Sequence, residues 1–304
     1  MSTADHPTEE QLPLAHKKDP IYGGVTLTEL CTCCGGDGPN ASSNNIPPHC
    51  LSPAELDRAL DECLPRWKQE GVREVSVRVP LKHSDLLATL HKHSFEYHHA
   101  RGDCAQLQLW LPADKACTVP KYPFTTVGVG GLVVSRDNKV LLMKERRGRY
   151  FGWKFPGGFA EPGENIFDTA CREVEEETGV PCVADFLVTF RHSTEVKFRW
   201  NCDDMYFVVA VHPANGANAD RNVVRLCPQE TAACRWFSRV ELSELETSEF
   251  PNFHRDILHK YDQCIANGAK VHCRSQERNF NNKVYHYKMY DIGWEQQELH
   301  VGKM

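Results

Sequence analysis

Long apolar runs are missing from this 304-residue sequence. No stretch approaches the roughly 18 consecutive apolar residues of a membrane-spanning helix, so we expect no contact with a membrane. The sequence also has no excess of basic over acidic residues: its formal net charge is −6. General nucleic-acid binders carry a positive excess, so we expect no nucleic-acid partner. A nucleotide substrate stays compatible with this charge, because a metal ion and a few local cations can offset phosphate charge.

The amino terminus lacks the features of a targeting segment. Residues 1–20, MSTADHPTEEQLPLAHKKDP, have no apolar core like that of a signal peptide and are too acidic for a mitochondrial presequence. Fourteen cysteines in such a chain are interpreted as reduced thiols. We therefore expect the protein in the cytoplasm, with the nucleus as a second candidate compartment.

One cysteine cluster lies in a segment rich in Gly, Pro, Ser and Asn, which predicts a loop. Cys31, Cys33, Cys34 and Cys50, together with His49, carry donor atoms that could bind zinc. Their C-x-C-C and H-C spacing fits no common zinc pattern, in which a pair of the form C-x₂₋₄-C is usual. Idle thiols are the favoured interpretation, and metal binding is the alternative.

Length and composition predict two domains. Residues 1–19 are polar and are predicted to be disordered. A small α/β domain is predicted over residues 20–118, and a second domain over residues 119–270. Residues 113–124 read as the linker between them. Residues 271–304 form a tail that we expect to pack on the second domain or on a partner.

The first domain reads as a βαβαββ unit. Ser52, Pro53 and Glu55 predict a capping box at the start of its first helix. His98 and His99 invite a catalytic or metal-binding role. Alternation along a strand points them to opposite faces, however, which favours two unrelated side chains. The expected strands are residues 23–30, 75–79, 95–100 and 106–111, and the expected helices are residues 52–70 and 85–93.

The second domain shows strand patterns on both sides of a glycine-rich turn. Residues 127–134 and 140–143 are expected to pair across the turn at Asp137 and Asn138. Residues 144–150 form a basic loop. Further strands are expected at residues 183–191, 205–211 and 234–237, a loop at residues 192–200, and helices at residues 240–245 and 253–266.

The stretch GGFAEPGENIFDTACREVEEETGV, residues 157–180, is the most informative part of the sequence. A helix is predicted over residues 165–178, with Gly179 as its stop. At helical spacing, Glu177 projects almost directly above the apolar Ala170, Glu173 lies at the shoulder of the same apolar arc, and Glu176 lies one step further round. Carboxylates turned toward a core edge repel one another and lose hydration, and a divalent cation such as Mg²⁺ or Mn²⁺ removes both problems. The alternative is a surface helix whose glutamates pair with lysines.

The same stretch resembles the sequence signature of the Nudix hydrolases, which cleave a nucleoside diphosphate linked to another moiety. The matching residues are Gly158, Glu164, Arg172-Glu173-Val174, Glu176-Glu177 and Gly179-Val180. This resemblance implies an α-β-α sandwich with a mixed sheet, dependence on Mg²⁺ or Mn²⁺, and often a homodimer.

The resemblance extends beyond the signature. The segments VRVPLKHSDLLATLHKHSFEYHHA, LQLWLP, WKFPGG and QETAACRWF are similar to a Nudix subfamily. That subfamily contains an animal protein encoded antisense to basic fibroblast growth factor and plant hydrolases of ADP-ribose and NADH. Its members carry a small α/β domain before the Nudix domain.

Several residue roles follow from the resemblance. Glu173, Glu176 and Glu177 match metal-binding glutamates, and Glu173 and Glu176 are candidate catalytic residues, with Glu176 orienting or deprotonating water. Gly158 matches a residue whose backbone carbonyl can join the metal shell. Glu230 is a candidate outer ligand or base, with a plain loop carboxylate as the alternative. Glu164 and Arg172 match a structural pair that holds the loop to the helix.

Substrate-binding candidates are also present. In the basic loop, Arg146, Arg147 and Arg149 could provide counter-charges for phosphates, or could form a solvated hairpin tip. Arg191 is a further candidate cation. Adenine could stack on an aromatic side chain, and ordinary core packing is the alternative for each candidate: Phe124, Tyr150 and Trp153.

Together the motif and the resemblance predict hydrolysis of a pyrophosphate bond in a nucleoside diphosphate derivative. ADP-ribose and NADH are the expected substrates, with AMP as a product. The alternative is a catalytically weak nucleotide-binding or regulatory protein on a Nudix scaffold.

Overall fold

The computed structural model divides the chain into two compact units, Met1–Pro123 and Phe124–Met304. We describe each unit by itself. The residues that the structure describes are 14–19, 23–28, 30, 50–148, 150–196, 201–214, 223–280 and 283–294.

The amino-terminal unit is a five-stranded sheet in the order β1-β2-β3-β5-β4. Its helices pack against the sheet through one apolar cluster that includes Leu56, Trp67 and Leu90. The βαβαββ order is present, preceded by the extra strand β1. The elements are β1 (His16–Lys18), β2 (Gly24–Leu27), α1 (Pro53–Gln69), β3 (Glu74–Pro80), the 3₁₀ helix η1 (Leu81–Leu86), α2 (Leu87–Lys92), β4 (Glu96–Arg101) and β5 (Cys104–Trp110).

Strand β1 corrects one expectation. Residues 16–18 were predicted to be disordered, yet they pair antiparallel with β2. Leu14, just before them, is buried in the core of this unit. A few apolar residues in a polar stretch are a weak signal, and the burial of Leu14 together with the pairing of β1 and β2 ties this segment to the sheet.

Helix α1 begins as its sequence predicts. The Ser52 hydroxyl accepts a hydrogen bond from the Glu55 N–H, and the Glu55 carboxylate accepts one from the Ser52 N–H. Pro65 lies inside α1, which continues to Gln69 without a break.

The histidine pair of β4 differs from its predicted alternation. The register of β4 against β5 shifts between Tyr97 and His99. The two imidazole Nδ1 atoms of His98 and His99 lie 2.7 Å apart, and the His99 ring stacks on Tyr122 at 4.5 Å. The prediction of opposite faces was wrong because a bulge cancels the two-residue period of a strand.

The cysteine interpretation is wrong at one position. Cys50 is disulfide-bonded, so it is neither an idle thiol nor a thiolate ligand for zinc. Cys31, Cys33, Cys34 and His49 lie outside the described residues. The free cysteines of the described chain are Cys63, Cys104, Cys117, Cys171, Cys182, Cys202, Cys227, Cys234, Cys264 and Cys273.

The carboxyl-terminal unit is built on a six-stranded mixed sheet in the order β13-β12-β9-β10-β6-β8. Strand β6 runs parallel to β10, and the other neighbours run antiparallel. A separate two-stranded sheet pairs β7 with β11. The strands are β6 (Thr125–Val133), β7 (Val140–Glu145), β8 (Gly157–Phe159), β9 (Cys182–Val196), β10 (Cys202–Pro213), β11 (Thr231–Phe237), β12 (Ala269–Phe280) and β13 (Lys283–Trp294).

Two sequence predictions fail in this unit. β6 and β7 were expected to form a hairpin, but only a single bridge joins Val134 to Val140. The first four residues of β7, 140–143, are buried, and the strand pairs with β11, far along the chain. The loop expected at residues 192–200 is strand at residues 192–196, because β9 continues along β10 to Val196.

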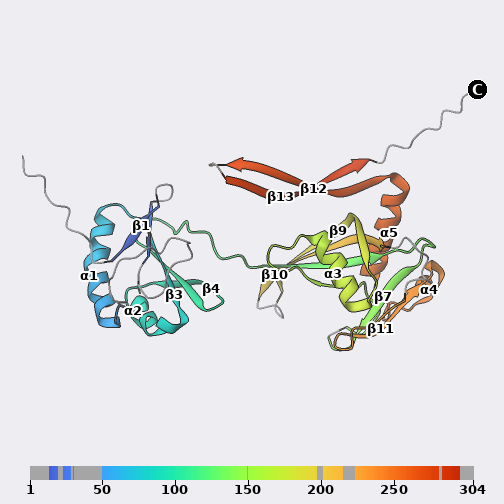
Figure 1. Ribbon diagram of the computed structural model, residues 1–304, viewed down its shortest axis with the longest axis horizontal. Coiled ribbons are helices and arrows are strands. Elements are labelled where there is room, and N and C mark those ends of the chain that lie inside the picture. Colours follow the sequence, from blue (N-terminus) through green and yellow to red (C-terminus); the bar gives the residue numbers. More distant parts are fainter. Residues whose placement is uncertain are drawn as a thin grey trace, which may run out of the picture. The chain divides into compact units, whose positions relative to one another are not determined.

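Helices cover both faces of the six-stranded sheet, so the predicted α-β-α sandwich is confirmed (Figure 1). Helix α3 (Ile166–Thr178) packs on one face through Ala170 and Val174. Helices α4 (Arg239–Glu244) and α5 (Asn252–Asn267) pack on the other. After α5 the chain forms the hairpin β12–β13, where the sequence indicated only a tail. None of the helices in the described part of the chain is long and apolar enough to cross a membrane.

The close approach of α3 to β6 depends on Gly131. A Cβ added there would lie 2.4 Å from a Val174 methyl carbon and 3.3 Å from the Ala170 carbonyl oxygen. We expect Gly131→Ala to lower the free energy of unfolding by about 1–3 kcal/mol, because α3 must shift away from the sheet. Denaturant unfolding measures this loss. Gly24→Ala is the matched control, since its added Cβ meets nothing nearer than 3.4 Å. An equal effect of both changes would contradict the packing argument.

Candidate functional site

The helix that carries the glutamates has well-defined ends. The Asn165 side chain accepts hydrogen bonds from the Phe167 and Asp168 N–H groups at 3.0 and 3.2 Å. Gly179 closes the helix in the left-handed region, with φ of 70°. These caps confirm the predicted helix limits and fix which residues face the sheet.

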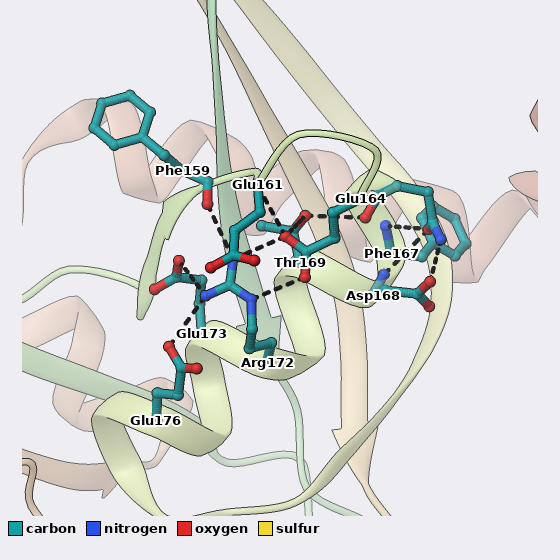
Figure 2. A network of polar contacts seen from close by, with 10 residues as sticks. Phe159, Glu161, Glu164, Phe167, Asp168, Thr169, Arg172, Glu173 and Glu176 are labelled. Carbon is teal, nitrogen blue, oxygen red and sulfur yellow. Dashed lines mark hydrogen bonds and ion pairs between the residues drawn. The ribbon is translucent and has the colours of Figure 1, made fainter. Parts of the chain in front are cut away.

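Arg172 is the centre of a polar network beside this helix (Figure 2). Its Nε and Nη2 atoms each donate to the Glu164 carboxylate at 2.8 Å, and Nη2 also donates to the Phe159 carbonyl at 3.0 Å. Its Nη1 donates to Glu173 at 2.8 Å and to Glu176 at 3.0 Å. The guanidinium therefore ties the glycine-rich turn to the helix and offsets three carboxylate charges. It also holds the pKa of Glu164 at about 2.

The three glutamates differ in burial in the order that the helical projection predicts. Glu177 is 5% exposed, the side chain of Glu173 is largely buried, and that of Glu176 is 56% exposed. Glu177 accepts a hydrogen bond from the Gly157 N–H at 2.7 Å. The core-edge position inferred for Glu173 and Glu177 is therefore present.

Burial changes the acidity of these carboxyl groups. It raises the pKa of Glu177 to about 7, against the opposing effects of Lys154 and the Gly157 N–H. Burial also raises the pKa of Glu173, while Arg172 lowers it. The charge of Glu230 adds to both upward shifts. Glu230 therefore lies close enough to act on the same group of carboxylates.

A cavity of about 670 Å³ lies beside the glycine-rich turn. Within it, the Lys154 ammonium pairs with the Glu145 carboxylate. A Cβ added to Gly158 would lie 2.6 Å from the Glu173 carboxyl carbon, so the bare backbone lets this carboxylate close over the turn. The lining residues are Glu145, Arg147, Lys154, Gly157, Gly158, Phe159, Ala160, Glu161, Pro162, Arg172, Glu173, Glu177, Gln229 and Glu230.

The basic loop is only partly directed to this cavity. Arg147 lines the cavity. Arg146 instead donates from Nη2 to the Thr231 carbonyl at 3.1 Å. Arg149 lies outside the described residues. One cation of the loop is thus placed to meet a ligand in the cavity.

The aromatic candidates lie elsewhere. Trp153 is 9% exposed and packs in the core against Phe237, so no flat ring of a ligand can stack on it. The Tyr150 hydroxyl donates to the Glu249 carbonyl at 2.9 Å. Phe124 is exposed just before β6. The described cavity lining includes none of these three side chains.

Sequence reasoning missed two cavity residues of opposite charge. Lys154 and Glu145 were named only as parts of longer segments, and neither belongs to the signature. The alternation of apolar and polar residues could have indicated Lys154, because it lies between Trp153 and Phe155, which are both buried. Their pairing depends on the β-bridge between Met143 and Lys154, which the sequence does not show.

The oxygen atoms at this site are of the kind that a hard divalent cation binds, but the described side chains are not arranged to coordinate one. Carboxylate and carbonyl oxygens are the ligands that Mg²⁺ and Mn²⁺ prefer. Among the described residues, no three acidic, His or Cys side chains stand arranged to hold one ion. Arg172 explains this, because its Nη1 engages both Glu173 and Glu176. The residues fit such an ion once these two carboxylates turn away from Nη1.

Comparisons with known proteins identify both units. A family model described as a NUDIX domain matches residues 124–261, and one described as a Nudix hydrolase domain matches residues 42–111. A Mus musculus protein named nucleoside diphosphate-linked moiety X motif 6 is 33% identical, over 64% of this chain and 60% of its own length. Its Xenopus laevis namesake is 34% identical, over 53% of this chain and 71% of its own.

Plant proteins are similar as well. Nudix hydrolase 8 of Arabidopsis thaliana is 31% identical, over 64% of this chain and 51% of its own length. The chain therefore spans about half to three fifths of the length of the first curated relatives that it matches.

The Arg172–Glu164 pair gives a test of stability against pH. We expect Arg172→Met to lower the free energy of unfolding by about 1–3 kcal/mol near neutral pH, because it leaves a largely buried carboxylate without its donors. The pKa of Glu164 is lowered from 4.5 to about 2 in the folded chain. The pair's stabilisation is therefore complete above pH 4.5 and is lost as the pH falls toward 2.

Thermal or denaturant unfolding of wild type and Arg172→Met across this pH range makes the comparison. Arg66→Met is the control, since Arg66 pairs with Glu70 at 3.2 Å on an exposed helix surface. A deficit in Arg172→Met that stays constant down to pH 2 would show that Glu164 is not the partner that matters.

Proposed function

Because this chain belongs to the Nudix hydrolase family, we propose that it hydrolyses the pyrophosphate bond of a nucleoside diphosphate derivative. ADP-ribose and NADH are the proposed substrates, with AMP as a product. The observation that carries the proposal is the buried pair Glu173 and Glu177, which lines a cavity together with the cations Lys154 and Arg147. Acidic groups at a core edge beside free space suit a cation, and basic groups beside them suit phosphate.

The proposed cofactor is Mg²⁺ or Mn²⁺. Glu173, Glu176, Glu177 and the Gly158 carbonyl are the groups that would hold it, with Glu173 and Glu176 released from Arg172. A divalent cation at such a site offsets charge on phosphate oxygens and lowers the pKa of bound water. Arg172 would keep its two bonds to Glu164, so the loop stays attached to the helix.

Phosphate binding is assigned to Lys154 and Arg147. The Lys154 side chain is 19% exposed and reaches the cavity, where it pairs with Glu145. A phosphate oxygen that approaches Lys154 competes with Glu145 for the same ammonium. We propose that Lys154 binds one phosphoryl group of the substrate in place of Glu145.

The proton of the attacking water needs an acceptor. Glu230 and Glu173 line the cavity, and the charge of Glu230 raises the pKa of Glu173. Glu176 is mostly exposed and is not among the described residues that line the cavity. This supports Glu230 or Glu173 over Glu176 as the group that orients and deprotonates water.

The second candidate function is binding of a nucleotide without turnover. The observation that favours it is the bridge that Arg172 makes between Glu173 and Glu176. If that bridge persists with a ligand bound, the carboxylates stay unavailable to an ion.

A homodimer and a location in the cytoplasm or the nucleus stay predictions from the sequence.

Replacing the cavity glutamates tests the proposed reaction. We expect wild type to hydrolyse ADP-ribose or NADH with Mg²⁺ or Mn²⁺. Glu177→Gln and Glu173→Gln should each lower kcat at least about 100-fold, because each removes a proposed ligand. Glu175→Gln is the matched control, since Glu175 is exposed on the same helix. Turnover that survives both cavity changes would move the chemistry elsewhere, and nucleotide binding by wild type without turnover would favour the second function.

If a substrate phosphate competes with Glu145 for Lys154, substitutions of these two residues should change KM in opposite directions. Lys154→Met should raise KM about tenfold, because a charged hydrogen bond to phosphate is lost. Glu145→Gln should lower KM by about two- to fivefold, because it releases the ammonium for the substrate. Steady-state kinetics on one substrate measures both. A rise in KM in both variants would show that the ion pair is needed intact, contrary to the assignment.

A further inference from the structure

Thr231, the first residue of β11, is fully buried and bonds to three different segments of the chain. Its hydroxyl donates to the Glu177 carbonyl at 2.8 Å, although the two residues lie 54 positions apart in the sequence. Its N–H donates to the Cys227 carbonyl at 3.0 Å, and its own carbonyl accepts from Arg146 Nη2 at 3.1 Å. Thr231 therefore joins helix α3, the turn before β11 and the basic loop.

The carboxyl-terminal end of α3 explains the place of the hydroxyl. The last carbonyls of a helix have no partner within the helix, so other groups must donate to them. The Arg225 N–H donates to the Thr178 carbonyl at 2.7 Å, and the Cys227 N–H donates to the Glu177 carbonyl at 3.3 Å. The Thr231 hydroxyl is the second donor to the Glu177 carbonyl and the closer of the two. Residues 225–231 thus close over the end of α3.

The same segment carries Glu230. Residues 228–230 form a turn, which the Thr231 N–H closes on the Cys227 carbonyl. The Glu230 carbonyl accepts from the Arg146 N–H at 2.7 Å. The peptide group between Glu230 and Thr231 is therefore held at both its carbonyl and its N–H. This fixes the backbone from which the Glu230 side chain reaches the cavity lining.

Strand β11 departs from regular pairing beside Thr231. Against β7, Thr231 lies opposite Glu145 and Ala233 lies opposite Lys144, so Ala232 is an extra residue in β11. An extra residue bends its strand, and bulges of this kind are common next to active sites, where they change the direction of a side chain. The bulge therefore separates the regular part of β11 from Thr231, whose hydroxyl is bonded to α3.

One hydroxyl links two sources of negative charge in the cavity. Glu177 and Glu230 both line the cavity and come from segments far apart in the sequence. Thr231 holds the carbonyl of Glu177 and directly follows Glu230. Two carboxylates in one site repel each other, so their backbones must be held to keep them there. The bonds of Thr231 provide that restraint.

We propose that Thr231 is a positioning residue for the reaction: its hydroxyl holds the Glu230 segment against the end of α3, so that the Glu230 carboxylate lies in the cavity with Glu173 and Glu177. This rests on the proposed function and adds a residue that touches neither substrate nor metal. Arg146, a candidate phosphate ligand in the sequence, supports the same arrangement through the Thr231 carbonyl. Loss of the hydroxyl displaces Glu230 and slows the chemical step without weakening substrate binding.

Substitutions of Thr231 in the full chain test this proposal. Thr231→Val keeps the shape of the side chain and removes the hydroxyl, whereas Thr231→Ser keeps the hydroxyl. With ADP-ribose and Mg²⁺, we expect Thr231→Val to lower kcat about tenfold at unchanged KM, and Thr231→Ser to keep the wild-type kcat. Thr178→Val is the matched control and should leave kcat unchanged, because this buried hydroxyl donates to the Val174 carbonyl within α3.

A double-mutant cycle shows whether Thr231 acts through Glu230. In a Glu230→Gln background, we expect Thr231→Val to lower kcat by less than about twofold, because the group that it positions is already changed. Equal losses in the two backgrounds would contradict the proposal. So would an equal loss of kcat in Thr178→Val, or a loss in Thr231→Val that Thr231→Ser shares.

Hydrogen exchange tests the same contact without turnover. The backbone amides of residues 225–231 should exchange about tenfold faster in Thr231→Val than in wild type, and at the wild-type rate in Thr178→Val. Unchanged exchange of this segment in Thr231→Val overturns the proposal. A wild type without turnover fails the proposed function, whereas the exchange comparison still decides whether Thr231 holds the Glu230 segment.

Discussion

The buried carboxylate of Glu177 is the constraint on which the site depends. It lies at the interface between α3 and the sheet with 5% of its surface exposed, and burial raises its pKa to about 7. A charge placed there costs several kcal/mol unless neighbours compensate. The Gly157 N–H and the Lys154 ammonium compensate in part. An additional positive charge beside Glu177, such as a bound cation, would stabilise the ionised form of this carboxylate.

The surrounding geometry follows from placing that carboxylate. Gly131 lets α3 approach β6, Gly157 lets β8 lie close against the backbone of β6, and Gly158 leaves room for the Glu173 carboxylate. Arg172 then fixes the turn to the helix through Glu164 and Phe159. The same guanidinium holds Glu173 and Glu176, so Arg172 has a structural role and a second role as a counter-ion. We infer that a divalent ion and Arg172 compete for these two carboxylates.

Local signals in the sequence were sufficient for the helices. Asn165 and Gly179 mark the ends of α3, and Ser52 with Glu55 marks the start of α1, because caps depend on residues next to one another in the chain. The helical period also ordered Glu177, Glu173 and Glu176 by burial. Partners far apart in sequence were not predictable in this way. The pairing of β7 with β11 and the place of Trp153 in the core both depend on tertiary packing.

At the site, too, local motifs were predictable from the sequence, whereas contacts between distant segments were not. The signature named the carboxylates and the Arg172–Glu164 pair, but it did not name Lys154 and Glu145, which meet through a β-bridge. At β4, one irregular residue was enough to bring His98 and His99 together against the strand period. Arg191 was predictable as a cation, whereas its position beside Tyr206 required the register of three strands.

The central claim is that the buried α3 carboxylates, Glu173 and Glu177, bind a divalent ion. Calorimetric titration of Mg²⁺ into the full chain at pH 7, in two buffers of different ionisation enthalpy, tests it most directly. We expect binding with release of on the order of half a proton, since Glu177 has a pKa of about 7, and we expect Glu177→Gln to abolish that release. No binding at up to about 10 mM Mg²⁺, or the same binding and proton release in Glu177→Gln, would contradict the claim.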